Sequence, residues 1–295
     1  MRTVYLGTSE FAAAVLRRLA VSPHRPELVI TRPDRPQGRG RRLAAPPVAQ
    51  AAGELGIELI QPASVNDEPT RARVSEIAPD AICVCAFGAL VKEPLLSEHL
   101  LLNLHPSLLP RWRGAAPIER AIMAGDDHTG VSIMRLTAGL DSGPVCLQAT
   151  EPISPQDTYG SVAARLQALG GELLVRALDT SPPCVEQDES LATYAEKITP
   201  EERRLDPDRP AAELERVVRA LTPHVGAHVE LEDGSWLGVS QARVLSADGP
   251  PVGVVSLAGP RPVLGCAQGS LELVVVQPAG GRLMAAEDFL RGRRG

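Results

Sequence analysis

The sequence predicts an α/β protein whose parallel or mixed sheet is wrapped by helices and followed by a small β-barrel. Strand and helix patterns alternate through the first two thirds of the 295 residues. A polar stretch, 187–210, interrupts them, and short runs with Gly and Pro turns follow Pro223. With 44% hydrophobic residues, the chain can bury one sizeable core and a smaller one, so we expect two domains.

The first two thirds contain short apolar runs of strand length. They are rich in Val, Ile and Leu, and polar residues or Pro bound them. The predicted strands are 3–6, 28–31, 81–87, 100–105 and 131–136.

Helical periodicity fills the segments between these runs. In 10–19, one face carries Phe11, Val15, Leu16 and Leu19. The other predicted helices are 48–55, 71–77, 117–124 and 158–178. The Gly7-Thr8-Ser9 turn holds a single glycine, which favours a plain βα turn over a phosphate loop.

The pattern changes after residue 178. We predict a first domain over 1–188, a linker over 189–208 and a second domain over 209–295. The second domain has five predicted strands, which suggest a small β-barrel. These strands are 225–231, 236–239, 242–245, 253–257 and 271–276.

Composition argues against several classes of protein. No run approaches the roughly 20 apolar residues of a membrane span, and no signal segment opens the chain, so we expect a cytoplasmic protein without membrane contact. The five cysteines lack metal-ligand spacing, and we assign them no chemistry and predict no metal. His224 and His228 have helical pair spacing, but Gly226 lies between them and no acidic or thiol partner is near.

The run 103–110, Asn-Leu-His-Pro-Ser-Leu-Leu-Pro, is the most informative part of the chain. Pro106 ends the preceding strand, and residues two apart in a strand share a face. Asn103 and His105 therefore offer an amide and an imidazole at the rim of the sheet, where open α/β sheets bind ligands. Asp141 follows a later strand in a Gly-rich loop, from which its carboxylate can reach the imidazole and orient it.

Each of these three residues has an ordinary structural interpretation on its own, as a turn former, a structural histidine or a solvated turn residue. Their combination instead predicts a catalytic site. No Ser or Cys stands beside a base, so we expect no covalent enzyme intermediate.

A basic loop, 32–47, is a second candidate site. It contains five arginines and one acid, Asp34, giving 5 − 1 = +4 in a chain of net charge −6. Such a segment attracts phosphate, and its length favours a functional or disordered loop over an ordinary solvated one. By contrast, 206–295 has 9 − 11 = −2 and gives no electrostatic support for RNA binding.

Five motifs resemble those of the methionyl-tRNA formyltransferase family, within the wider group of enzymes that transfer a formyl group from 10-formyltetrahydrofolate. They are 7–12 (Gly-Thr-Ser-Glu-Phe-Ala), 33–40 (Pro-Asp-Arg-Pro-Gln-Gly-Arg-Gly), the central run 103–118, 193–198 (Thr-Tyr-Ala-Glu-Lys-Ile) and 277–280 (Gln-Pro-Ala-Gly). The resemblance implies a Rossmann-like formyltransferase domain and an OB-like C-terminal domain that binds tRNA. It also implies formyl transfer to methionyl-initiator tRNA, for translation initiation, by a monomer.

The resemblance further implies roles for individual residues. The catalytic residues are Asn103, His105 and Asp141. The folate-binding residues are Phe87, Gly88, Ala89, Leu90, Ser107, Leu108, Leu109 and Pro110. The tRNA-binding residues are Arg35, Arg39, Arg41 and Arg42, with Arg39 at the principal contact.

Three alternatives stay open at this stage. A formyltransferase acting on an amino-sugar nucleotide would share the catalytic trio but would not need the basic loop. A formyltetrahydrofolate hydrolase would use the trio with water as acceptor. A non-catalytic RNA-binding protein would not need the trio at all.

Overall fold

The computed structural model describes residues 1–37, 42–246 and 249–294. Its contacts divide the chain into two compact units. The first contains Met1–Gly114, Thr129–Pro152 and Ala163–Tyr194. The second contains Ala115–His128, Ile153–Val162 and Ala195–Gly295. Two short internal segments therefore belong with the C-terminal unit.

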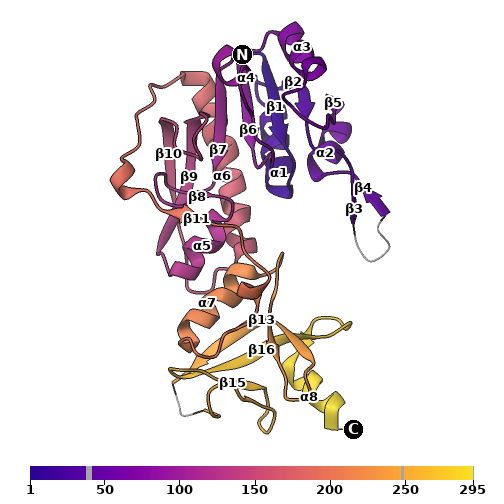
Figure 1. Cartoon of the computed structure of the whole chain (residues 1–295), viewed down its shortest axis with the longest axis vertical. Coiled ribbons are helices and arrows are strands. Elements are labelled where there is room, and N and C mark those ends of the chain that lie inside the picture. Colours follow the sequence, from indigo (N-terminus) through magenta and orange to yellow (C-terminus); the bar gives the residue numbers. More distant parts are fainter. Residues whose placement is uncertain (38–41, 247–248, 295) are drawn as a thin grey trace. The chain divides into compact units, whose positions relative to one another are not determined.

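A seven-stranded sheet forms the centre of the first unit (Figure 1). Its first five strands are parallel, and β9 runs antiparallel to β7. The order is β5 (Glu58–Ile60), β2 (Pro26–Ile30), β1 (Thr3–Gly7), β6 (Ala81–Cys85), β7 (Leu101–His105), β9 (His128–Arg135) and β10 (Val145–Pro152). This confirms the α/β fold with a mostly parallel sheet. The sequence prediction missed β5, which has only three residues, and the half-exposed β10.

Helices cover both faces of this sheet. They are α1 (Glu10–Ala20), α2 (Pro47–Leu55), α3 (Glu68–Ile77), α4 (Leu95–Glu98) and α6 (Tyr159–Thr180). Side chains alternate along β1, so Val4 and Leu6 join an apolar cluster with residues of α3 and α4. Tyr5 points to the opposite face, where its hydroxyl donates to the carbonyl of Ala12 in α1 at 2.7 Å.

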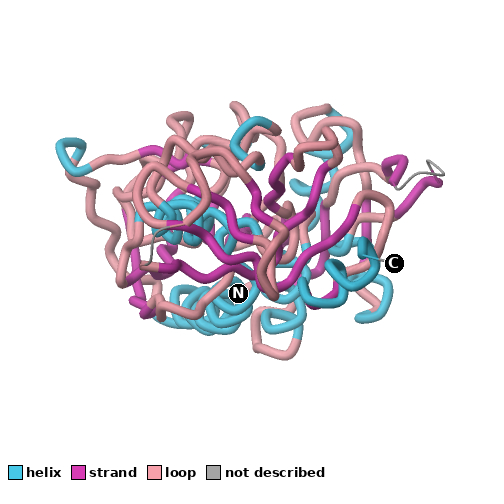
Figure 2. Tube along the Cα trace, turned by 90° about the horizontal axis from the view of Figure 1, so that it is seen from below, coloured by secondary structure: helices cyan, strands magenta, loops and turns pink. Residues whose placement is uncertain are grey.

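The basic loop contains regular structure, which corrects the expectation of an irregular segment. β3 (Arg35–Gln37) and β4 (Arg42–Ala44) pair as an antiparallel ribbon, with Arg35 opposite Ala44. Figure 2 shows the two strands at the margin of the molecule. Strand pairing satisfies backbone groups that an irregular loop would leave to water.

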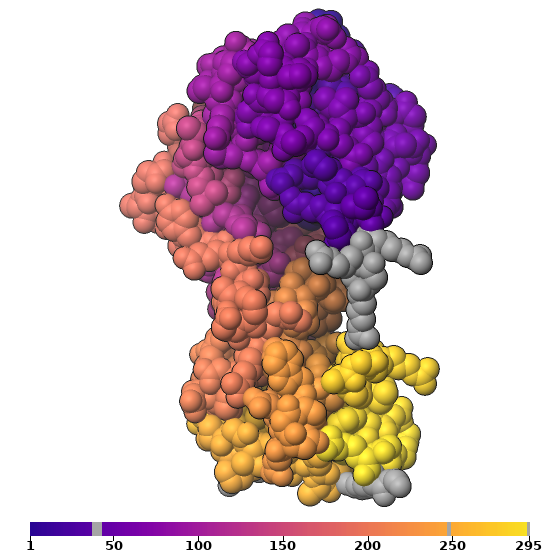
Figure 3. Space-filling view, turned by 45° about the vertical axis from the view of Figure 1, so that its right-hand side comes forward, coloured from indigo at the N-terminus to yellow at the C-terminus, as the bar shows by residue number. Residues whose placement is uncertain are grey.

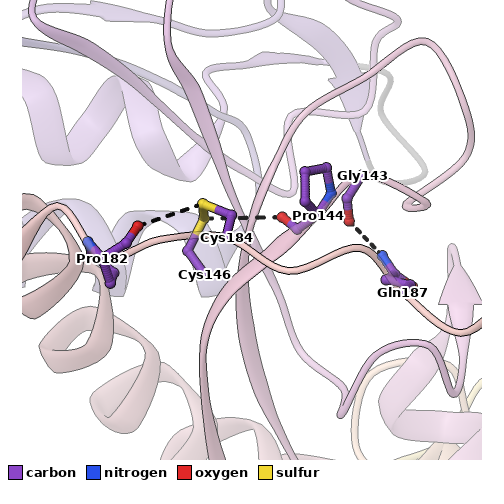
Figure 4. Close-up of a disulfide and its surroundings, with 6 residues drawn as sticks. All are labelled: Gly143, Pro144, Cys146, Pro182, Cys184 and Gln187. Carbon is purple, nitrogen blue, oxygen red and sulfur yellow. Dashed lines mark hydrogen bonds between the residues drawn. A yellow bond between two sulfur atoms is a disulfide. The ribbon is translucent and has the colours of Figure 1, made fainter.

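The start of the predicted linker is held against the first unit. We call residues 184–193 the strap. Val145 and Val185 exchange two backbone hydrogen bonds of 2.8 and 2.9 Å, and Cys146 forms a disulfide with Cys184 (Figure 4). The strap continues through a 3₁₀ turn, η1 (Glu189–Leu191). It leads into β11 (Tyr194–Ala195), which pairs with β8 (Arg113–Gly114).

The disulfide corrects the assignment of no chemistry to Cys146 and Cys184, since their proximity depends on the fold and not on sequence spacing. The other cysteines, Cys83, Cys85 and Cys266, are free and buried. Burial raises the pKa of Cys83 and Cys85 to about 12, so both remain thiols at neutral pH.

The second unit is built on an antiparallel sheet, which confirms the OB-like domain. Its strands are β12 (Ala227–Glu230), β13 (Trp236–Leu245), β16 (Ser270–Pro278), β15 (Val263–Gly265), β14 (Val255–Ser256) and the short β17 (Met284–Ala285). The predicted strands 236–239 and 242–245 are one strand, because β13 continues through an irregularity at Gln241.

Helices and a short turn complete this unit. They are α5 (Pro117–Ala124), η2 (Glu201–Arg203), α7 (Ala211–Leu221) and α8 (Ala286–Arg294). The core contains residues of α7, α8 and the strands, among them Val218, Leu237, Leu271 and Phe289. The C-terminal residues, yellow in Figure 3, reach the surface. Across the described residues of both units, no helix has the length and apolar character needed to cross a membrane.

Candidate active site

Two polar residues stand at the carboxyl end of the central strand β7. Asn103 is 8% exposed and His105 is 4% exposed. Leu104, between them, points to the opposite face, because the position of a Cβ on Gly170 of α6 would lie 2.9 Å from its Cδ1. By strand alternation, Asn103 and His105 therefore share the other face.

The imidazole of His105 is held between a carbonyl and a carboxylate. Its Nε2 lies 2.8 Å from the carbonyl oxygen of Trp112, and its Nδ1 lies 3.5 Å from Oδ2 of Asp141. A carbonyl only accepts, so Nε2 carries a proton in this arrangement. Protonation of Nδ1 then gives an imidazolium facing the carboxylate.

Both partners of His105 have left-handed backbone. Trp112 has φ of 63° and Asp141 has φ of 46°. Asp tolerates this region better than Trp, for which it is an outlier. Asp141 is also held by the backbone N–H of Gly114, which donates to Oδ2 at 2.9 Å. Surrounding contacts must therefore fix both segments.

The side-chain amide of Asn103 makes no hydrogen bond to any residue in the described part of the chain. Buried amides normally find partners. An amide without one, at the rim of the sheet and on the same face as His105, is available to a ligand oxygen.

The predicted folate segment 107–110 is bonded mainly to the protein itself. Ser132 Oγ donates to the Ser107 carbonyl at 2.6 Å and accepts from the Leu109 N–H at 3.1 Å. Gln148 donates to the Leu109 carbonyl at 2.8 Å. Ser107 and Leu109 are buried. Leu108 and Pro110 are the members of this segment that reach the surface.

In the other predicted folate segment, 87–90, the carbonyl groups and the N–H groups differ in their partners. Its carbonyls at Phe87, Gly88 and Leu90 accept hydrogen bonds from Thr8, Arg32 and Asn66, respectively. The N–H groups of residues 88–90 have no acceptor among the described residues. This segment thus presents free donors to a ligand edge rich in acceptors.

A pocket of about 240 Å³ lies where β1, β2 and β6 end. The sequence prediction assigned no role to its polar members Thr8 and Ser9, and it placed Arg32 only in the basic loop 32–47. Its remaining lining residues include Arg35, Pro46, Pro47 and Phe87. The βα turn, taken by sequence as plain, therefore borders a cavity. The signal that could have identified it is the position of this turn at the carboxyl end of the first strand.

The structure describes two of the four residues predicted to bind tRNA. Arg35 is exposed on β3 and Arg42 begins β4. Arg39 and Arg41 lie outside the described residues. Within the residues described, no group of three or more His, Cys, Asp or Glu side chains could hold a metal ion.

Three comparisons place this chain among known proteins. Residues 1–178 match the formyl transferase model and residues 197–294 match the formyl transferase C-terminal domain model. A methionyl-tRNA formyltransferase from Methylococcus capsulatus is 44% identical, with 98% of this chain and 96% of the relative aligned. One from Ectopseudomonas mendocina is 41% identical, with 100% and 95% aligned.

Among solved structures, HypX from Aquifex aeolicus in complex with tetrahydrofolic acid has a TM-score of 0.66 at 17% identity, over 98% of this chain and 47% of that one. This likeness concerns the fold alone. The full-length sequence matches decide the family, and they confirm the resemblance. The chain belongs to the formyl transferase family, in the group of the methionyl-tRNA formyltransferases.

Proposed function

We propose that this protein transfers the formyl group of 10-formyltetrahydrofolate to the α-amino group of methionyl-initiator tRNA in the cytoplasm, for translation initiation. The observation that carries the proposal is the side-chain amide of Asn103, which no described residue hydrogen-bonds, on the same face of β7 as an imidazole that faces the carboxylate of Asp141. The full-length similarity to methionyl-tRNA formyltransferases supports this choice of donor and acceptor.

Each member of the trio has a distinct role. The bound folate supplies an activated formyl group on N10. Asn103 donates to the formyl oxygen, on which negative charge develops as the amine attacks. His105, as imidazolium, adds positive charge near that oxygen. Asp141 orients the ring and accepts the proton lost by the attacking amine, since its side chain remains 14% exposed. When the tetrahedral intermediate collapses, the bond between the formyl carbon and N10 breaks, and this proton is returned to N10 as tetrahydrofolate leaves.

Folate binding uses the free donors of 88–90. These N–H groups suit a pterin ring, whose edge carries hydrogen-bond acceptors. Leu108 and Pro110 supply apolar surface on the other segment. The buried Ser107 and Leu109 shape that segment from within.

The basic loop 32–47, whose described part includes the ribbon β3–β4, carries the tRNA contacts. Arg35 and Arg42, together with Arg39 and Arg41, concentrate positive charge on a segment of the first unit. Such charge binds phosphate without reading sequence. The first domain, 1–188, holds donor and catalyst, and 209–295 contributes further tRNA contacts through Arg282, which forms no ion pair within the described residues.

One assay tests the proposal against its alternatives. Purified monomeric protein and 10-formyltetrahydrofolate carrying a ¹⁴C-formyl group are incubated with methionyl-initiator tRNA, with an amino-sugar nucleotide, or without acceptor. We expect label on the tRNA alone. Label on the sugar, or release of formate without acceptor, would instead indicate the sugar-nucleotide enzyme or the hydrolase. The Asn103→Ala variant is the matched negative control.

A further inference from the structure

We propose that the strap is the positioning element of the active site, and that Gln187 and Thr193 are its positioning residues. This inference rests on the proposed catalytic roles of His105 and Asp141. It assigns functions to two side chains that bond the backbone around these residues and not the imidazole of His105 or the carboxylate of Asp141.

Gln187 holds the backbone of the loop that carries Asp141. Its amide nitrogen donates to the carbonyl of Asp141 at 2.8 Å and to the carbonyl of Gly143 at 2.7 Å. Figure 4 shows Gln187 directed towards Gly143 from the strap. Two bonds from one amide span both sides of Ser142, so they restrain the left-handed turn at Asp141.

Gln187 is itself fixed by a buried cation. Its side-chain oxygen accepts from Nε and a terminal nitrogen of Arg113 at 3.0 and 2.8 Å. Arg113 is 2% exposed and also binds both carboxylate oxygens of Glu189 in the strap, at 2.9 and 2.7 Å. Every hydrogen-bonding atom of the Gln187 amide is therefore engaged, and the amide cannot rotate without breaking these bonds.

Thr193 holds the other partner of His105. Its hydroxyl oxygen accepts from the backbone N–H of Trp112 at 2.9 Å, and its carbonyl accepts from the N–H of Arg113 at 2.9 Å. The carbonyl of the same Trp112 residue accepts from Nε2 of His105. The strap thus fixes both sides of the imidazole, one through Asp141 and one through Trp112.

The beginning of the strap is attached to the same loop. The disulfide joins Cys184 to Cys146, close after Gly143 and Pro144 (Figure 4). The Val145–Val185 bridge adjoins it in both segments. Both left-handed residues, Trp112 and Asp141, thereby lie within a network that starts and ends on the strap. Displacement of a catalytic group by about 1 Å reduces rates by about 10²-fold, so this network matters for turnover.

Three variants test the inference. Gln187→Leu removes the whole amide, Gln187→Glu keeps an acceptor for Arg113 but loses both donors, and Thr193→Val removes one hydroxyl. We expect kcat to fall by about 10- to 100-fold in each, with KM for folate changed less than about 3-fold. Thr180→Val is the matched control, because the Thr180 hydroxyl donates to the Arg176 carbonyl in α6 and makes no hydrogen bond to an active-site residue in the described part of the chain.

A double-mutant cycle shows whether Gln187 acts through Asp141. In the Asp141→Asn background we expect Gln187→Leu to reduce kcat by less than about 3-fold. The same 10- to 100-fold loss in both backgrounds would overturn the inference. So would wild-type kcat in both Gln187→Glu and Thr193→Val.

A measurement without substrate separates this inference from the proposed function. The ¹⁵N resonances of the His105 ring in the free protein should shift in Gln187→Glu and Thr193→Val but not in Thr180→Val. Shifted resonances together with absent tRNA formylation would reject the proposed function and retain the strap. Unchanged His105 resonances in the variants, together with formylation activity in the wild-type enzyme, would reject the positioning role of the strap and leave the proposed function in place.

Discussion

Nδ1 of His105 lies 3.5 Å from Oδ2 of Asp141, although the two residues come from a central strand and a distant loop. The same carboxylate oxygen accepts from the N–H of Gly114 at 2.9 Å. One oxygen thus ties together the strand end, the catalytic loop and β8. Asn103 lies on the same face of β7, and its side-chain amide accepts or donates no hydrogen bond among the described residues.

Replacing Asn103 by Ala removes the donor to the formyl oxygen. We expect kcat for formyl transfer to fall about 10²- to 10³-fold, because an oxyanion donor acts on charge that develops in the transition state. Folate affinity, measured by equilibrium binding, should change little. A turnover equal to wild type would exclude Asn103 from the chemistry.

Asn66→Ala is the informative comparison for that variant. Asn66 donates to the Leu90 carbonyl at 2.8 Å and accepts from the Lys92 N–H at 2.8 Å. Its loss should loosen the predicted folate segment and raise KM for folate while leaving kcat nearly unchanged. The two asparagine variants thus separate catalysis from donor binding.

Asp141→Asn keeps the side-chain shape and removes the charge that faces His105. Asn also tolerates left-handed backbone, so the fold should persist. We expect kcat to fall by about 10²- to 10⁴-fold, the usual range for loss of acid–base catalysis. Asp67→Asn is the control: Asp67 caps α3, where Asn is an equally good cap, and activity should match wild type.

Arg39→Ala tests the basic loop 32–47. We expect KM for methionyl-tRNA to rise. The slope of log KM against log salt concentration should become smaller by about 1, as for loss of one phosphate contact. Arg17→Ala, an exposed residue of α1 paired with Glu54, should leave both unchanged. An unaltered salt slope in Arg39→Ala would reject the basic loop 32–47 as a phosphate-binding segment.

Acid stability should depend on Glu202. A hydrogen bond from Arg120 holds the pKa of this carboxyl below its ordinary 4.5, against the opposing effect of burial. The folded-state pKa is the lower one, so the stabilisation is complete above the unfolded-state value and lost as pH falls through the folded-state value. As pH falls from the unfolded-state pKa to the folded-state pKa, the free energy of unfolding measured with urea should therefore decrease more steeply in wild type than in Glu202→Gln. The exposed Glu27→Gln should follow wild type.

The disulfide should stabilise the first unit under oxidising conditions. It closes a segment of sequence separation 38, for which chain entropy predicts about 3 to 4 kcal/mol. Cys146→Ser should lower the urea midpoint of oxidised protein to that of reduced wild type and respond no further to reductant. A midpoint in wild type that ignores reductant would contradict this expectation.

The sequence by itself predicted the elements that depend on local pattern. Apolar runs ended by Pro106 or by Gly turns give β1, β6 and β7, and amphipathic spacing gives α1 and α6. It failed where pattern is weak, as in the three-residue β5, and where one strand carries an irregularity, as in β13. Pairing partners, which lie elsewhere in the chain, define those elements.

The candidate trio could be chosen from sequence because strand alternation places Asn103 and His105 together and a Gly-rich loop frees Asp141 to reach them. The role of the strap could not be predicted from the sequence. Gln187 and Thr193 lie in the polar stretch 187–210, to which the sequence assigned no site residue, and Cys184 is 38 residues from Cys146. Local residue patterns determined the strands and helices, whereas only the tertiary fold decided which distant groups meet, because hydrogen bonds and disulfides form between atoms close in space whatever their separation along the chain.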